Sequence, residues 1–297
     1  MHFEILGGYS MHAYLIMAHN EFELLKKLII TLDYENNDLF IHVDKKVNDF
    51  DFDSIKRLVK KSNIYILQNR VDVYWGGYSQ IQGELNLLKA AVKKKEYDYL
   101  HLLSGVDFPI KRNSYIHQFF SENKGKEFIS FDIKNQDSKE TLDRVRYYYL
   151  LQDRIGRNSL VLRKIQTAMV ILQKILGLNR LKKLHGEFQI KKGMNWFSIT
   201  GDLAKYLISK EEEIKKVFQH GLCADELFLQ TIAWNSPFRE KITNNTMRYI
   251  DWERGIPYVF RKEDFNELMT VDKLFARKFS YEKYPEIIDK LIEVLDE

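Results

Sequence analysis

Short apolar runs alternate with segments of helical period over the first 130 residues, and this alternation restricts the fold more than any other feature. Residues 13–18 form a continuous apolar run, the pattern of a strand buried on both faces. We expect further strands at 38–43, 64–67, 99–103 and 127–131, with helices at 21–32, 53–61, 78–94 and 114–120. The order predicts parallel βαβ units in an α/β fold, with ligands at the carboxyl ends of the strands.

The composition is that of a globular enzyme-like chain. Its 297 residues, 45% of them hydrophobic, suffice for one large domain or two small ones. Cys223 is the only cysteine, which excludes an intramolecular disulfide and favours a reducing compartment. Neither GxGxxG nor GxxxxGK[ST] occurs, so dinucleotide-binding and P-loop sites lose support.

Charge and hydropathy restrict the partners and the location. The net charge of +4 is too mild to indicate nucleic acid by itself. No apolar run approaches the roughly 18 residues that span a bilayer, and the N-terminus lacks a signal-peptide pattern. We expect residues 1–10 to be an N-terminal extension of one domain, 11–297, with a nucleotide-binding half to about 132 and an acceptor and catalytic half from about 133.

Residues 154–183 differ from the rest of the chain because they are rich in lysine and arginine and contain no acidic residue. Apolar residues lie between these charges, as in a helix that rests on an anionic membrane surface. The alternative is a surface helix whose apolar stripe packs on the core. The pattern alone leaves both interpretations open.

The second half of the chain continues with less regular elements. Strand-like segments are expected within 188–200, at 248–250 and at 258–260. Helices are expected at 202–208, 225–234 and 281–295.

Aspartates follow several of the predicted strands. Asp49, Asp51 and Asp53 alternate before a short helix, where helix capping is a better interpretation than a metal site. Asp44 ends the second strand and Asp107 follows the fourth, which places both at the expected ligand edge. A buried polar pair and a turn residue, respectively, are the structural alternatives.

Eight motifs occur in an order that resembles the core-2/I-branching β-1,6-N-acetylglucosaminyltransferase family, which includes the peptide O-xylosyltransferases. They are AYLIMAHN (13–20), IHVDKK (41–46), VYWGGYSQIQGEL (73–85), YLHLLSGVDFPIK (99–111), GMNWFSIT (193–200), ADELFLQTIAWNSPF (224–238), RYIDW (248–252) and LFARKF (274–279). The resemblance implies a GT-A-like fold, with a mixed, mostly parallel central sheet flanked by helices. It also implies inversion at the anomeric carbon and no metal cofactor.

The resemblance also implies roles for charged residues. Glu226, the glutamate of the Asp-Glu pair, matches the family's catalytic base. Lys278, with Arg277 beside it, matches the basic residues that neutralise the donor diphosphate. Arg254 is the candidate for a second diphosphate-binding arginine. Without the resemblance, Arg277 and Lys278 would be interpreted as a solvated surface pair.

Donor and acceptor contacts are implied in the same way. The nucleotide is expected near Asp44, Val73 and Trp75, with Asp107 at the same edge. Acceptor sugars are expected at Trp196 and Trp252, because an aromatic face suits the C–H surface of a sugar ring. A core tryptophan is the alternative.

The animal enzymes carry a membrane anchor and many cysteines, whereas this sequence shows one cysteine and no membrane-spanning run. The chain is therefore identified as a short bacterial member of the family. We therefore expect a cytoplasmic enzyme, peripheral to the inner face of the membrane, that moves GlcNAc or a related sugar from a UDP-sugar to a glycan. The acceptor would be a surface-polysaccharide precursor, lipid-linked in such pathways. The alternatives are a glycoside hydrolase, which usually needs two flanking carboxylates, and a non-catalytic, membrane-associated carbohydrate-binding protein.

Overall fold

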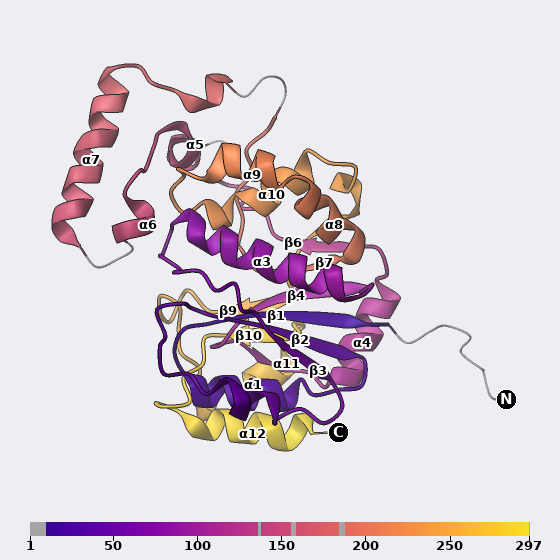
Figure 1. Cartoon of the computed structure of the whole chain (residues 1–297). Helices are drawn as coiled ribbons and strands as arrows, with labels where there is room; N and C mark the ends of the chain where they lie inside the picture. The colour runs from indigo at the N-terminus through magenta and orange to yellow at the C-terminus, as the bar shows by residue number, and fades with distance from the viewer. Residues whose placement is uncertain (1–9, 136–137, 156–158, 184–187, 297) are drawn as a thin grey trace.

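The computed structural model describes residues 10–135, 138–155, 159–183 and 188–296. A seven-stranded sheet runs through its centre, with helices on both faces (Figure 1). In spatial order, the strands are β3 (Asn63–Ile66), β2 (Asn37–Val43), β1 (His12–Ala18), β4 (Tyr99–Ser104), β7 (Phe197–Thr200), β6 (Glu127–Ile129) and β8 (Ile242–Asn244). This arrangement confirms the predicted α/β fold. The predicted N-terminal extension falls largely on residues 1–9, which lie outside the described residues.

The first four strands of this sheet are parallel, as their apolar runs predict. β1 pairs with β2 and β4, and β2 pairs with β3, all in parallel register. β7 reverses the direction by pairing antiparallel to both β4 and β6. Along β1, Tyr14 and Ile16 join the core on one face, whereas Ala13 and Leu15 join the core on the other.

Two layers of helices cover these two cores. The Tyr14 side is covered by α1 (Phe22–Thr31), α4 (Asn113–Glu122), α11 (Phe265–Thr270) and α12 (Pro285–Leu295). The opposite side is covered by α3 (Tyr78–Lys94), α8 (Gly201–Ser209), α9 (Glu211–Phe218) and α10 (Phe228–Trp234). Figure 1 shows the sheet between α3 above and α1 with α12 below.

A second, three-stranded sheet brings the C-terminal part of the chain to the end of β4. Its central strand β10 (Phe275–Arg277) pairs antiparallel with β5 (Phe108–Pro109) and parallel with β9 (Arg248–Ile250). This pairing places Arg277 beside the loop that follows β4. The fold thereby joins two motifs that are far apart in the sequence.

Several predicted elements need correction. Residues 258–260 are not a strand, although Phe260 N donates to Lys278 O and Lys278 N donates to Tyr258 O. Within 188–200, β7 is the only strand that forms. The helix α2 (Phe52–Lys56) ends earlier than predicted. The last helix begins later than predicted, at Pro285, whose ring suits the first helical turn. The 225–234 helix is divided into the 3₁₀ turn η2 (Ala224–Glu226) and α10.

The basic stretch lies in an arm that includes α6 (Gln152–Ile155) and α7 (Leu160–Ile175). Figure 1 shows α7 at the edge of the molecule, away from the central sheet. Its buried residues are Gln166, Val170 and Gln173, so α7 turns mainly polar side chains inward. The exposed side chains include Leu160, Val161, Ile165, Ile171, Leu172, Ile175 and, just beyond the helix, Leu176. The apolar stripe therefore faces solvent. This finding contradicts the interpretation in which the stripe packs on the core.

No helix in the described ranges has both the length and the apolar composition needed to cross a membrane.

Candidate active site

The carboxyl ends of β1, β2 and β4 meet at one edge of the main sheet. Asp44 N donates to Ala18 O at 2.8 Å, and Gly105 N donates to Met17 O at 2.8 Å. These bonds hold together the loops that follow the three strands. In open α/β sheets this edge is where ligands bind.

Lys46 joins two of the predicted nucleotide-binding residues. Its Nζ lies 2.8 Å from Asp44 Oδ2 and donates to Val73 O at 2.6 Å. Lys46 was not predicted as a site residue, although it stands two residues after Asp44 in the IHVDKK motif (41–46). His42 is buried and has a structural role, because its Nε2 accepts from Val71 N at 3.0 Å.

Asp107 is fully buried and holds Arg277. Its Oδ1 lies 2.7 Å from Arg277 Nη1 and accepts from Ser104 Oγ at 2.9 Å, while Oδ2 accepts from Ser104 N at 2.8 Å. The Arg277 guanidinium also lies 4.3 Å from the centre of the Trp196 ring. Asp107 therefore faces Arg277 rather than the open edge of the site.

His19 follows β1 and has Asp44 and three cations around it. Burial lowers the pKa of His19, and Asp44 partly opposes this change. The positive charges of Lys278, Lys46 and Arg277 lower it further, so all three cations lie within electrostatic reach of His19. A concentration of positive charge at this edge suits a diphosphate.

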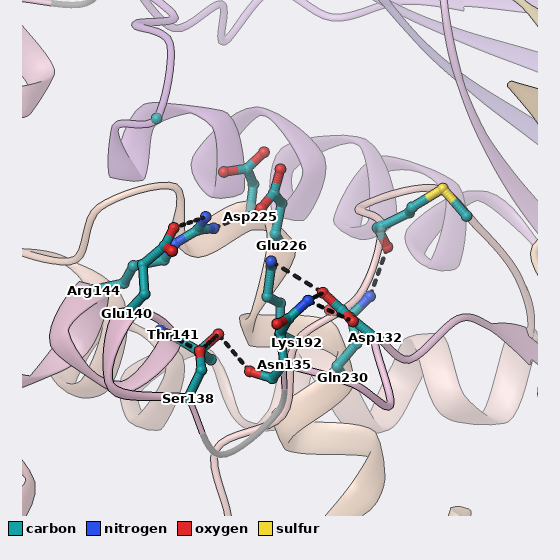
Figure 2. A network of polar contacts seen from close by, with 12 residues as sticks. Asp132, Asn135, Ser138, Glu140, Thr141, Arg144, Lys192, Asp225, Glu226 and Gln230 are labelled. Carbon is teal, nitrogen blue, oxygen red and sulfur yellow. Dashed lines mark hydrogen bonds and ion pairs between the residues drawn. The ribbon is translucent and has the colours of Figure 1, made fainter. Parts of the chain in front are cut away.

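Glu226 ends η2, and Arg144 from α5 (Lys139–Arg146) holds its side chain (Figure 2). Arg144 Nη1 donates to Glu226 Oε2 at 2.6 Å, and the Glu226 side chain remains 39% exposed. Burial lowers the pKa of Arg144, but its hydrogen bond to Glu226 and the charge of Glu226 outweigh this and raise it. The arrangement presents an oriented carboxylate to solvent.

The segment 193–196 connects Glu226 to the basic residues. Gly193 N donates to Glu226 O at 2.9 Å, and Trp196, three residues later, lies against Arg277. A Cβ atom at Gly193 would lie 1.8 Å from Ser130 O, so only glycine fits here. The segment 193–196 thus runs from a backbone bond with Glu226 to a side-chain contact with Arg277.

Asp225 is buried, whereas the side chain of the adjacent Glu226 is partly exposed. Burial, followed by the charge of Glu226, raises the pKa of Asp225 to about 7. Glu84 lies buried nearby, and burial together with the charge of Asp225 raises the pKa of Glu84 well above its ordinary value. Paired carboxyls in unlike environments take unlike roles, and Glu226 is the one suited to meet a substrate.

Other predicted site residues lie at the surface or have strong partners. Trp75 and Trp252 are exposed, at 48% and 57%. Arg254 forms ion pairs with Asp251, Asp264 and Glu267, the last two at 2.8 and 2.6 Å. These three carboxylates already offset the charge of Arg254, which counts against its predicted role at a diphosphate.

Of the three alternating aspartates, Asp51 has the helix-capping role that the sequence predicts. Asp51 caps α2 by accepting from Asp53 N at 3.1 Å and Ser54 N at 3.0 Å. Within the part of the chain that the structure describes, no three histidine, cysteine, aspartate or glutamate side chains gather in a way that could hold a metal ion.

A family model and several curated proteins match most of this chain. The family model described as "Branch: Core-2/I-Branching enzyme" matches residues 12–276. Xylosyltransferase 2 of Rattus norvegicus is 24% identical over 312 residues, which cover 96% of this chain and 33% of the relative. Xylosyltransferase sqv-6 of Caenorhabditis briggsae is 24% identical over 283 residues, 86% of this chain and 33% of the relative. The chain thus spans about a third of the length of these relatives.

Solved structures of glycosyltransferases are also similar, although distantly. Apo mouse xyloside xylosyltransferase 1 is 11% identical, with a TM-score of 0.39 and coverage of 90% of this chain and 96% of that one. Galactosyltransferase LgtC, in complex with donor and acceptor sugar analogs, is 8% identical, with a TM-score of 0.43 and coverage of 97% of both chains. Scores this low support no conclusion on their own.

Proposed function

Because the chain belongs to the Core-2/I-branching enzyme family, a family of glycosyltransferases, we propose that it transfers a sugar from a UDP-sugar to a hydroxyl of a glycan acceptor. We propose that GlcNAc or a related sugar is transferred with inversion and without a metal ion. The observation that carries this proposal is the partly exposed carboxylate of Glu226, which Arg144 orients by a hydrogen bond of 2.6 Å.

In this proposal Glu226 is the general base. The acceptor oxygen attacks the anomeric carbon as Glu226 takes its proton, and the bond from that carbon to the diphosphate breaks. A new glycosidic bond forms, UDP leaves with the bonding electron pair, and Glu226 later returns the proton to water. The ion pair with Arg144 engages Oε2 and fixes the orientation of the carboxylate.

Basic side chains would stabilise the departing diphosphate. Lys278 and Arg277 are the proposed partners, with Lys46 close by at the same edge. Positive charge held in place before the reaction stabilises the negative charge that develops on the leaving group. Asp107 would orient Arg277 instead of touching the nucleotide.

The remaining contacts are proposed from the family resemblance and from their position. Asp44, Val73 and Trp75 would hold the nucleotide, since Lys46 ties Asp44 and Val73 together. Trp196 and Trp252 would receive acceptor sugar rings. Trp252 has the exposed ring face that such a contact requires.

We also propose that the exposed face of α7 rests on an anionic membrane. Its apolar side chains are accompanied by Arg163, Lys164 and Lys174, and no acidic residue occurs between positions 154 and 183. Such a helix binds by burying apolar area and by attraction to anionic lipids. The acceptor would then be a lipid-linked precursor of a bacterial surface polysaccharide, used at the inner face of the cytoplasmic membrane.

Vesicle sedimentation tests the membrane contact. The protein should sediment with vesicles that contain phosphatidylglycerol and remain in solution with phosphatidylcholine alone. Leu172→Glu should abolish sedimentation, whereas Ile30→Glu, which changes an exposed apolar residue of α1 in the same way, should not. Equal binding to both kinds of vesicle would remove the anionic-surface part of the proposal.

Release of UDP tests the reaction itself. A panel of UDP-sugars is mixed with candidate glycan acceptors, and acceptor-dependent UDP is measured with EDTA and with manganese. We expect release that EDTA does not inhibit. Loss of activity in EDTA with recovery in manganese would contradict the metal-free step, whereas glycan cleavage without UDP release would indicate a hydrolase.

A further inference from the structure

Buried amide side chains join α7 to α6 within the arm. Gln166 of α7 is buried, and its Nε2 donates to Gln152 Oε1 at 2.9 Å. Gln166 Oε1 accepts from Leu151 N at 3.1 Å. Buried polar groups that satisfy one another in this way fix a single geometry, since breaking one bond leaves the other group unpaired.

Gln152 continues the connection to the turn at residues 75–77. Its Nε2 donates to Trp75 O at 2.7 Å. The adjacent Asp153 accepts from Tyr78 N at 3.2 Å and Ser79 N at 3.0 Å, so it caps the start of α3. The arm is thus bonded to the turn and to the helix that follows it.

The other side of the same turn contacts η2 and the residue before it. Cys223 N donates to Gly76 O at 2.9 Å, and Gly76 N donates to Gln80 Oε1 at 2.6 Å. Gln80 Nε2 then donates to Asp225 Oδ2 at 3.3 Å. A Cβ atom at Gly76, where φ is +69°, would lie 3.0 Å from Cys223 Sγ and 3.3 Å from Gln152 Nε2. The turn is therefore packed tightly between the arm and the segment that ends in Glu226.

From this geometry we infer that Gln152 and Gln166 are positioning residues, which couple the arm to the 75–77 turn and, through it, to η2. The inference rests on the proposed function, in which the arm lies on an anionic membrane. Segments that unfold locally as one unit exchange their amide hydrogens together. If lipid holds the arm, local unfolding that involves the arm, the turn and η2 becomes rarer. The carboxylate of Glu226 is then held most firmly where a membrane-borne acceptor would arrive.

Hydrogen exchange followed by mass spectrometry tests this coupling on the full chain. The probes are vesicles of phosphatidylcholine, with and without phosphatidylglycerol. For the unmodified protein, the anionic vesicles should slow amide exchange in α7 and also at residues 75–80 and 223–226. Gln166→Leu keeps the side chain's size but removes the bond to Gln152, so the protection of α7 should remain and that of the two distant segments should be lost.

Gln173→Leu is the matched control. Gln173 anchors the same helix to Tyr148, accepting from Tyr148 N at 2.8 Å and donating to Tyr148 O at 3.0 Å. Without vesicles, Gln166→Leu should speed exchange at 75–80 about tenfold, as expected for the loss of about 1.4 kcal/mol, and Gln173→Leu should do so far less. Equal effects of the two variants, or vesicle protection confined to α7, would overturn the coupling. Absence of vesicle binding would instead refute the membrane proposal, and the comparison without vesicles would still decide the coupling.

Discussion

The variant Asp107→Asn tests whether Asp107 orients Arg277 for UDP binding in addition to stabilising the fold. The carboxylate accepts three hydrogen bonds, two from Ser104 and one from Arg277 Nη1 at 2.7 Å. An asparagine keeps the shape of the side chain, but it loses the charge and presents an NH₂ group where an oxygen stood. Arg277 then loses its charged partner, while its bond to Ser104 Oγ at 2.9 Å and its contact with the Trp196 ring remain.

The magnitude follows from the burial of the pair. A hydrogen bond to a charged group contributes about 1.5–3 kcal/mol, and breaking a fully buried ion pair costs about 3–5 kcal/mol. The Arg277 side chain is 18% exposed and regains some hydration, whereas Asp107 is 0% exposed. We therefore expect a loss of about 2 kcal/mol in the free energy of unfolding, or about 4 °C in Tm. We also expect UDP affinity to fall by about tenfold, since the guanidinium is held less firmly toward the diphosphate.

Isothermal titration with UDP and thermal unfolding measure the two effects separately. The control is Asp33→Asn, because Asp33 accepts from Lys60 N, Lys61 N and Ser62 N on the surface of the fold and has no part in the proposed site. This control should lower Tm and leave UDP affinity unchanged. If Asp107→Asn behaves in the same way, Arg277 does not serve the diphosphate, and the reasoning fails.

The other predictions concern the basic residues and two buried histidines. Lys278→Ala should weaken UDP binding about tenfold, because it removes a full charge from the donor edge. Arg254→Ala should instead lower Tm with little change in UDP affinity, since three carboxylates already engage Arg254. Isothermal titration with UDP and thermal unfolding test both predictions. Burial holds the pKa of His12 and His101 well below 6.5, so both stay neutral in the fold and gain protons on unfolding. The free energy of unfolding should therefore fall as pH drops below 6.5, by up to about 1.4 kcal/mol per pH unit for each histidine. In urea titrations at about pH 7.5 and about pH 5, His101→Gln should lose less stability than the unmodified protein; an identical loss would contradict the buried-neutral interpretation.

The sequence predicted the first half of the fold well because periodicity is a local signal. The apolar run at 13–18 became β1, and the helical period at 78–94 became α3 with the predicted bounds. α5 was missed because it contains few apolar residues, and of its three buried residues, Thr141, Asp143 and Val145, only the last is hydrophobic. The pairing of β10 with β5 and β9 was also invisible, since it depends on contacts between distant parts of the chain.

The site could be predicted only in part. Ordered motifs predicted roles for Glu226, Arg277 and Lys278, whereas the contacts of Arg277 with Asp107 and Trp196 required the structure. Arg144 carries no local signal, because it reaches Glu226 across 82 positions of sequence. The outward face of α7 was likewise undecidable from its pattern, since an apolar stripe looks the same whether it packs on a core or faces solvent.

The central claim is that Glu226 is the base. The most direct measurement is acceptor-dependent UDP release by Glu226→Gln, with UDP affinity and Tm determined on the same preparation. The substitution keeps the size of the side chain and an oxygen for Arg144 but removes the proton-accepting charge, so we expect turnover to fall by about 10²–10⁴-fold with UDP binding intact. A variant that keeps more than about a tenth of the original rate, a deficit of less than about 1.4 kcal/mol in the barrier, would contradict the assignment.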